Sequence, residues 1–329
     1  MAGALLMLFA LAVSLWAWPM LRGAQAEAAV RIPGDSSPEA VRDSLSRAFG
    51  EGYAGGVLRA LKLSGGSPER TAGLYAVDAG TPAWRLARRL RYGRQTPVRL
   101  TFNNIRTLDQ LAERVGARMA FGPEDFLEAC DSVLPRHGFR GQAAYPAAFL
   151  PDTYEFYWTT DAGTVVERLV GERNRFWTDE RRNKAKALGL NPVGVATVAS
   201  IVEEETAVND ERPTVARLYV NRLARGMKLQ ADPTVKFAAG DFTLRRITGK
   251  HLATSSPYNT YIHAGLPPGP IRIPERSTMD AVLNAPEHGY IYMCARPDFS
   301  GRHNFAADFA THDRNARAYR QALDKRGIK

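Results

Sequence analysis

The first 21 residues constrain the fold of this chain more than any other stretch, because none of their side chains is charged. The hydrocarbon core of a bilayer is about 30 Å thick and is crossed by a helix of about 20 apolar residues. Trp16 and Trp18, near the end of the run, suit the interface between membrane and water. We therefore expect residues 1–23 to form a retained membrane anchor, with the rest of the chain folding outside the bilayer.

Two other interpretations of this run stay open. Residues 24–26, Ala-Gln-Ala, resemble a signal-peptidase site, although a secretion signal normally begins with basic residues and has a shorter apolar run. A buried core helix is the third interpretation. The orientation of an anchor does not follow from charge, because no Lys or Arg precedes the run. Residues 24–37 are small, polar and Pro-containing, which is typical of a linker leaving the membrane.

The composition limits the remaining fold and its partners. A chain of 329 residues with 45% hydrophobic side chains can bury ordinary cores and predicts two domains beside the anchor. The net charge of +10 fits an anionic partner, yet no nucleic-acid-binding signature occurs, so we expect no nucleic acid partner. The cysteines and histidines lack metal-ligand spacing, so we expect no metal and no cofactor. Whether Cys130 and Cys294 form a disulfide stays open.

The first half of the body predicts a small α+β module. Helices are expected after Ser37-Pro38 and over residues 53–63. Four further elements follow in the order strand, helix, strand, helix: 73–77, a helix that begins at Thr81-Pro82 and ends before Gly93, 98–102, and 107–116. This order resembles the LysM-like module that precedes the catalytic domain in one family of cell-wall enzymes, and we assign residues 38–140 to it.

The second half, residues 141–329, predicts a mainly helical domain with long loops and some short strands. The helices are expected at 162–177, 193–206, 214–225 and 310–323, from apolar spacing and from capping residues. Residues 230–274 are rich in Pro, Gly, Asn and Tyr and are expected to form a long loop, which in a compact domain usually serves function. The expected fold class of the whole chain is therefore α+β.

One carboxylate in the predicted helix 193–206 is placed for acid catalysis. Each helical residue turns by about 100°, so Glu205 falls on the same face as Val198, Ile201 and Val202, while its two glutamate neighbours point elsewhere. A carboxyl held among apolar side chains loses solvation, which raises its pKa toward the range useful for protonating a leaving group. Geometry alone leaves open a surface carboxylate that reaches water.

Polar stretches near this helix suit a carbohydrate site. Amide and hydroxyl side chains bind sugar hydroxyls and acetamido groups, while tyrosine rings lie on pyranose faces. The candidates for substrate binding or for stabilising an oxocarbenium ion are Asn221, Gln230, Asp232, Tyr258, Asn259 and Tyr261.

Several motifs occur in one order: Ala199-Ser-Ile-Val-Glu-Glu-Glu-Thr206, Gly226-Met-Lys-Leu-Gln-Ala-Asp-Pro-Thr-Val235, Ser256-Pro-Tyr-Asn-Thr-Tyr261 and Gly265-Leu-Pro-Pro-Gly-Pro270, flanked by Leu150-Pro-Asp-Thr-Tyr-Glu155 and Gly301-Arg-His-Asn-Phe305. They resemble the endolytic murein transglycosylase family across residues 145–325. The family motif has two glutamates around one residue, commonly Lys, where this chain has Glu204. The resemblance implies that the second glutamate, Glu205, is the essential acid, with Glu203 as the fallback, and we expect the two extra carboxylates to raise the pKa of Glu205 further.

The resemblance also implies a reaction, a location and partners. Members are bacterial inner-membrane proteins with a single span, and the bulk of the chain lies in the periplasm or outside the cytoplasm. They are lyases that cut peptidoglycan glycan strands internally between N-acetylmuramic acid and N-acetylglucosamine, leaving 1,6-anhydro ends and terminating strand elongation. Peptidoglycan synthases or division proteins are then candidate partners. The alternatives left open are a non-catalytic peptidoglycan-binding scaffold, a muramidase hydrolase and, more distantly, a membrane-anchored nucleic-acid binder.

Overall fold

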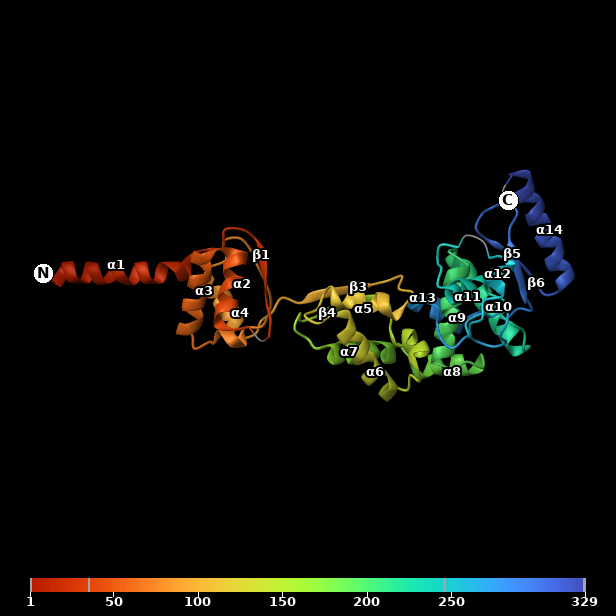
Figure 1. The fold of residues 1–329 in the computed structure, drawn as a ribbon, viewed down its shortest axis with the longest axis horizontal. Helices are drawn as coiled ribbons and strands as arrows, with labels where there is room; N and C mark the ends of the chain where they lie inside the picture. The colour runs from red at the N-terminus through yellow and green to blue at the C-terminus, as the bar shows by residue number, and fades with distance from the viewer. Residues whose placement is uncertain (1, 35, 245–246, 328–329) are drawn as a thin grey trace. The chain divides into compact units, whose positions relative to one another are not determined.

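The computed structural model describes residues 2–34, 36–244 and 247–327 (Figure 1). The described chain forms two compact units that interleave along the sequence. Unit 1 contains the residues up to 100 together with 113–125 and 153–165, and unit 2 contains 101–112, 126–152 and the described residues from 166 onward.

The core of unit 1 is built from one antiparallel strand pair and three helices, and the N-terminal helix precedes them. In the pair, Val30 lies opposite Tyr75, and alternate side chains of the first strand face the core. The hydrophobic core contains residues from all of these strands and helices. The elements are α1 (Ala2–Leu21), β1 (Ala28–Ile32), α2 (Pro38–Phe49), α3 (Glu51–Leu63), η1 (Pro68–Arg70), β2 (Gly73–Val77) and α4 (Ala83–Arg91).

The apolar first helix, α1, is long and apolar enough to cross a membrane over Ala4–Leu21. The expected linker after it was wrong in part, because residues 24–37 contain strand β1. Val30 and Ile32 are buried while Arg31 between them is exposed, a two-residue alternation typical of a strand on a core. The alternation covers only a few residues, and the small, polar and Pro residues around it therefore favoured the prediction of a linker.

The predicted α+β module has the expected elements but different pairing. Strand β2, helix α4, strand β3 (Val98–Phe102) and helix α5 (Leu108–Gly116) occur where they were predicted. However, β2 pairs with β1, whereas β3 pairs with β4 (Asp152–Phe156). The two strands of the predicted module, β2 and β3, therefore lie in different sheets. The LysM-like assignment of residues 38–140 stays a prediction.

The remaining chain is rich in helices, and its predicted helices 162–177, 193–206, 214–225 and 310–323 are confirmed to within a few residues. The predicted loop 230–274 was wrong in one respect, because it contains two helices. The elements are α6 (Pro123–Val133), η2 (Leu134–His137), η3 (Gln142–Ala148), α7 (Ala162–Phe176), α8 (Asp179–Ala187), α9 (Pro192–Glu205), η4 (Asn209–Glu211), α10 (Arg212–Ala224), α11 (Asp232–Ala239), α12 (Gly249–Leu252), α13 (Arg276–Leu283), β5 (Tyr292–Ala295), β6 (His303–Ala306) and α14 (Phe309–Lys325).

Helix α9 is the centre of unit 2. Its side chains from residue 194 to residue 203 are all buried, and it contacts α8, α10, α11, α13 and η3. Asn191 caps its first turn by accepting a hydrogen bond from the backbone N–H of Gly194 at 2.8 Å, and Pro192 stands at its first position. A helix surrounded in this way holds its last residue, Glu205, in a fixed place.

Candidate active site

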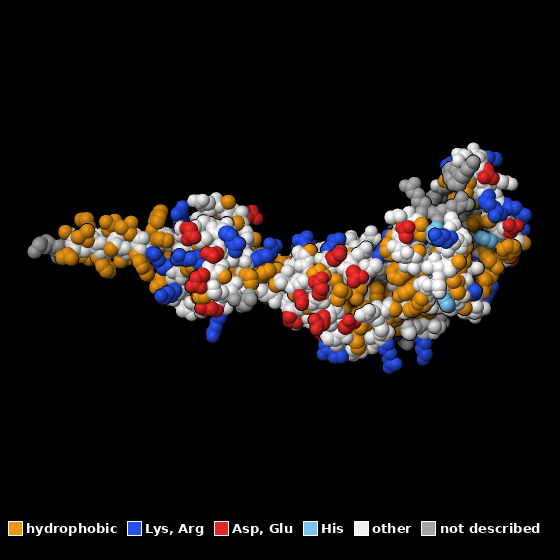
Figure 2. Space-filling model, viewed as in Figure 1, with side chains coloured by type: hydrophobic (Ala, Val, Ile, Leu, Met, Phe, Trp, Pro, Cys, Tyr) orange, Lys and Arg blue, Asp and Glu red, His pale blue; other side chains and the backbone are white. Residues whose placement is uncertain are grey.

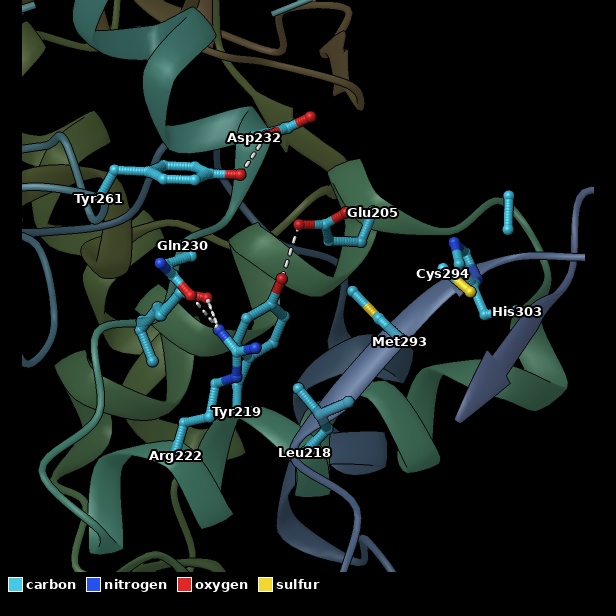
Figure 3. A pocket seen from close by; sticks show the side chains of 12 residues that line it. Glu205, Leu218, Tyr219, Arg222, Gln230, Asp232, Tyr261, Met293, Cys294 and His303 are labelled. Atoms are coloured by element: carbon cyan, nitrogen blue, oxygen red, sulfur yellow. Dashed lines mark hydrogen bonds between the residues drawn. The ribbon is translucent and has the colours of Figure 1, made fainter. Parts of the chain in front are cut away.

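A cavity of about 270 Å³ opens beside the end of α9 (Figure 3). Its lining residues come from α9, α10, the segment leading into α11, the loop around residue 261, and the β5–β6 hairpin. Four of the predicted site residues line it together: Glu205, Gln230, Asp232 and Tyr261.

Glu205 is the last residue of α9 and is partly exposed to the cavity. The three apolar residues that share its predicted face, Val198, Ile201 and Val202, are fully buried. Burial raises the pKa of Glu205 to about 7, and the negative charge of Asp232 acts in the same direction. Both protonation states of this carboxyl are therefore populated near neutral pH.

Tyr219 on α10 donates a hydrogen bond from its hydroxyl to Oε1 of Glu205 at 2.6 Å (Figure 3). This hydrogen bond favours the carboxylate and opposes the effect of burial. Burial, and the charge of Glu205, hold the pKa of Tyr219 well above its usual value, so the hydroxyl remains a donor. Tyr219 was not among the candidate site residues predicted from the sequence. The available signal was that a buried tyrosine hydroxyl needs a partner.

Asp232 and Tyr261 form a second pair on the cavity wall. The Tyr261 hydroxyl donates to Oδ1 of Asp232 at 2.6 Å. Asp232 begins α11, and the Pro at position 233 suits the first turn of that helix. The pair brings together two predicted residues that lie 29 positions apart.

Gln230 and Arg222 both line the cavity and contact each other. Gln230 has a positive φ of 50°, which is uncommon for a residue with a side chain. The Arg222 guanidinium donates to the carbonyls of Ile291 at 2.6 Å and Leu229 at 2.7 Å, and its contact with Oε1 of Gln230 is 3.4 Å long. Arg222 thus ties α10 to the chain before α11 and to the chain before β5, a role that sequence reasoning missed.

Glu203 and Glu204 face two arginines of unit 2 instead of the cavity. Oε2 of Glu203 lies 3.1 Å from Nε of Arg272, and Oε1 of Glu204 lies 2.7 Å from Nη1 of the same guanidinium. Arg106 adds a second ion pair to Glu204 at 3.2 Å. The expectation that these carboxylates raise the pKa of Glu205 was wrong in its cause, because arginines balance their charge and burial is the main cause.

Three predicted substrate-binding residues do not line this cavity. The Asn221 amide donates to the carbonyls of His288 and Tyr290. The fully buried Asn259 donates to the carbonyls of Leu252 and Thr254. The Tyr258 ring packs on Phe237 with centroids 4.6 Å apart. The two amides hold loops in place, so direct contact with a ligand in the cavity is not expected of them.

The β5–β6 hairpin supplies the other wall of the cavity through Met293, Cys294, Ala295 and His303. Oε1 of the buried Glu211 accepts a hydrogen bond from the backbone N–H of His303 at 3.0 Å, and Oε2 of Glu211 lies 3.1 Å from Nδ1 of His303. His303 belongs to a motif that sequence analysis singled out, but no role was assigned to it. Cys130 and Cys294 are both free thiols, so the open question of their pairing is answered in the negative.

Known proteins resemble this chain over most of its length. The model of the YceG-like family matches residues 30–318. A protein of Bacillus subtilis strain 168 named endolytic murein transglycosylase is 34% identical over 149 residues, which are 44% of this chain and 40% of that protein. One of the same name from Streptococcus pneumoniae strain D39 is 26% identical over 276 residues, which are 74% of this chain and 50% of that protein.

A crystal structure of a YceG-like protein of Listeria monocytogenes superposes with a TM-score of 0.58 and 26% identity, covering 88% of this chain and 98% of that one. The chain spans half or less of the length of the two transglycosylases named above.

Proposed function

Because this chain belongs to the YceG-like family, we propose that it is an endolytic murein transglycosylase whose acid is Glu205. One observation carries the assignment to this residue. Glu205 is partly exposed in the cavity with a pKa of about 7, whereas its two neighbouring glutamates are held by arginines. A carboxyl with a pKa near the working pH serves equally well as proton donor and as proton acceptor.

The proposed reaction uses this one carboxyl twice. Tyr219 holds Oε1 of Glu205, so the other oxygen carries the proton. That proton passes to the glycosidic oxygen between N-acetylmuramic acid and N-acetylglucosamine, the bond from C1 to this oxygen breaks, and an oxocarbenium-like state forms. The C6 hydroxyl of the same muramic acid then attacks C1 and gives its proton to Glu205. The product is a 1,6-anhydro end, and no water is consumed.

The other cavity residues are proposed to bind the sugar. Asp232 carries a negative charge near the developing oxocarbenium ion, and Tyr261 holds that carboxylate in place. Gln230 presents an amide suited to an acetamido or hydroxyl group. Asn221, Tyr258 and Asn259 then support the loops around the site. No metal or cofactor takes part in this scheme.

The location and partners are proposed from the same membership. Helix α1 anchors the chain in the cytoplasmic membrane as a single span, with the body outside the cytoplasm. Peptidoglycan glycan strands are the substrate, and cleavage within new strands terminates their elongation. Synthases or division proteins are the protein partners expected beside such an activity.

Digestion of purified glycan strands by the full-length protein in detergent tests this proposal. Mass spectrometry of the products should find 1,6-anhydro-muramic ends on fragments from inside the strand. Ordinary reducing ends would instead identify a muramidase hydrolase. Tight binding without any cleavage would favour the peptidoglycan-binding scaffold.

Replacing Tyr219 by Phe should move the pH dependence of cleavage. The variant lacks the hydroxyl that favours the Glu205 carboxylate, so the pKa of Glu205 rises and the decline of activity with rising pH moves to higher pH. At pH 6 we expect a rate within about tenfold of the parent protein, because the acid itself is intact. A pH profile of initial rates measures this, and an unchanged profile would argue against the role of Tyr219.

Glu205 should also make the folded state less stable at high pH. Its pKa rises from 4.5 to about 7 on folding, so the folded state holds the proton more tightly and stability falls as pH rises through this window. Glu205→Gln removes that dependence. We expect the variant to be more stable than the parent by about 1–2 kcal/mol at pH 8, after allowing for partial exposure, with no difference at pH 4. Thermal unfolding at both pH values measures the difference.

A further inference from the structure

Backbone hydrogen bonds join the end of helix α1 to the rest of unit 1. Directly after the helix, the N–H of Ala24 donates to the carbonyl of Thr81 at 3.0 Å, and the N–H of Gly80 donates to the carbonyl of Ala24 at 2.8 Å. The N–H of Ala83 donates to the carbonyl of Arg22 at 3.1 Å. These bonds fix the chain at the end of α1, so the helix and the body of unit 1 move together.

Helix α3 lies against the last turns of α1. A Cβ atom added to Gly56 would meet the backbone carbonyl of Pro19, so the two helices approach closely only because Gly56 has no side chain. One turn further along α3, Nη1 of Arg59 donates to the carbonyl of Trp16 at 2.6 Å, and its guanidinium lies 5.8 Å from the centre of the Trp16 ring.

These contacts show in which direction α3 runs along α1. Moving along α3 from Gly56 to Arg59 moves along α1 from Pro19 back to Trp16. The C-terminal end of α3 is therefore directed toward the part of α1 that precedes Trp16. Lys62 and Leu63 follow Arg59 by three and four positions and so share its side of the helix.

The side chains at this end of α3 combine positive charge with apolar surface. Leu63 is 58% exposed, and Lys62 is exposed beside it. Figure 2 shows Lys and Arg side chains gathered where the apolar helix α1 enters unit 1. An exposed leucine flanked by basic side chains suits the boundary between acyl chains and headgroups.

The length of α1 brings this surface to the membrane. The apolar window Ala4–Leu21 corresponds to about 27 Å of helix, close to the thickness of about 30 Å of the hydrocarbon core. Trp16 and Pro19, which α3 contacts, lie in the last turns of this window, at the end of the span where Trp16 suits the interface between membrane and water. The end of α3 can then lie no further from the bilayer than its headgroups.

We propose that the end of α3, formed by Arg59, Lys62 and Leu63, is a lipid-binding surface that lies in the headgroup region of the membrane crossed by α1. Leu63 enters the boundary of the acyl chains, while Arg59 and Lys62 contact lipid phosphates. The proposal rests on the proposed anchoring by α1 and is independent of glycan cleavage.

Fluorescent labels on single cysteines test the proposal in the full-length protein. Leu63→Cys reports on the surface, Leu8→Cys reports on the anchor, and Arg31→Cys is the control on β1, which Figure 1 shows on the side of unit 1 away from α1. Cys294 is replaced by Ser, whereas Cys130 is fully buried and burial raises its pKa to about 12, so it does not react. The protein is reconstituted into vesicles of phosphatidylethanolamine and phosphatidylglycerol.

We expect lipids with a nitroxide near the headgroup to quench the label at position 63 about threefold more than the label at position 31, and aqueous iodide to show the reverse order. Reversing both basic charges, Arg59→Glu with Lys62→Glu, should return the label at position 63 toward water. A label at position 63 that behaves like the one at position 31, while position 8 is embedded, would overturn the proposal and leave the anchor standing. Exposure of position 8 to iodide would overturn both, whatever the outcome of glycan digestion.

Discussion

Glu205→Gln is expected to lower the rate of glycan cleavage by a factor on the order of 10²–10⁴, because an amide neither gives nor accepts the proton. The fold should persist, since the amide oxygen still accepts the hydrogen bond from Tyr219. Binding of glycan strands should therefore change little while turnover is lost. Initial rates and glycan binding, measured side by side on the same preparations, give the result.

Glu203→Gln is the matched control, two positions away on the same helix. Its buried carboxylate forms an ion pair with Arg272 and accepts a hydrogen bond from the backbone N–H of Glu275. The variant keeps an acceptor for that N–H. We expect a rate within about tenfold of the parent and the same anhydro product. Full turnover in the Glu205 variant, together with loss of turnover in the Glu203 variant, would move the acid to Glu203.

Arg272→Met is expected to destabilise the protein by about 3–5 kcal/mol, because it leaves a buried carboxylate without its cation. The side chain of Glu203 is only 2% exposed, so water cannot take the place of the guanidinium. The same change removes a partner of Glu204. The loss should be larger at pH 8 than at pH 5, since burial already raises the pKa of Glu203 and protonation removes the unpaired charge. Unfolding by denaturant at the two pH values measures both effects.

A double variant separates this ion pair from general loss of packing. Glu203→Gln combined with Arg272→Met removes both charges, and it should recover part of the stability lost by Arg272→Met alone. Equal stability of the single and the double variant would show that Arg272 acts through packing or through Glu204.

The helices of unit 2 could be predicted because local signals agree with their final environment. Asn191 and Pro192 mark the start of α9, and Gly226, with a φ of 66°, follows the end of α10. The angular argument that set Glu205 among apolar residues needed only the helical period. Long-range partners were not accessible in the same way, because nothing local to Glu203 or Glu204 indicates that arginines 272 and 106 will reach them.

The choice among the polar candidates failed for a related reason. An asparagine that binds sugar and one that holds a loop carry the same amide, and only the backbone carbonyls near Asn221 and Asn259 distinguish them. The pairing of β1 with β2 and of β3 with β4 was missed because five-residue strands do not specify their partners. By contrast, the Pro at position 233 and Gly240 are local signals for α11 that the amount of Gly, Pro and Asn in the segment obscured.

The hydrogen bonds of Arg222 and Glu211 bear on the order in which the cavity is completed during synthesis. Arg222 reaches the carbonyl of Ile291, and Glu211 holds His303, so the walls of the cavity come from segments made about 70 and 90 residues apart. The ribosome releases helix α9, which carries Glu205, long before the β5–β6 hairpin that completes the cavity. If Glu205 is the acid, as proposed, the nascent chain carries it without a substrate site, and cleavage of glycan strands is expected only after β5 and β6 have folded.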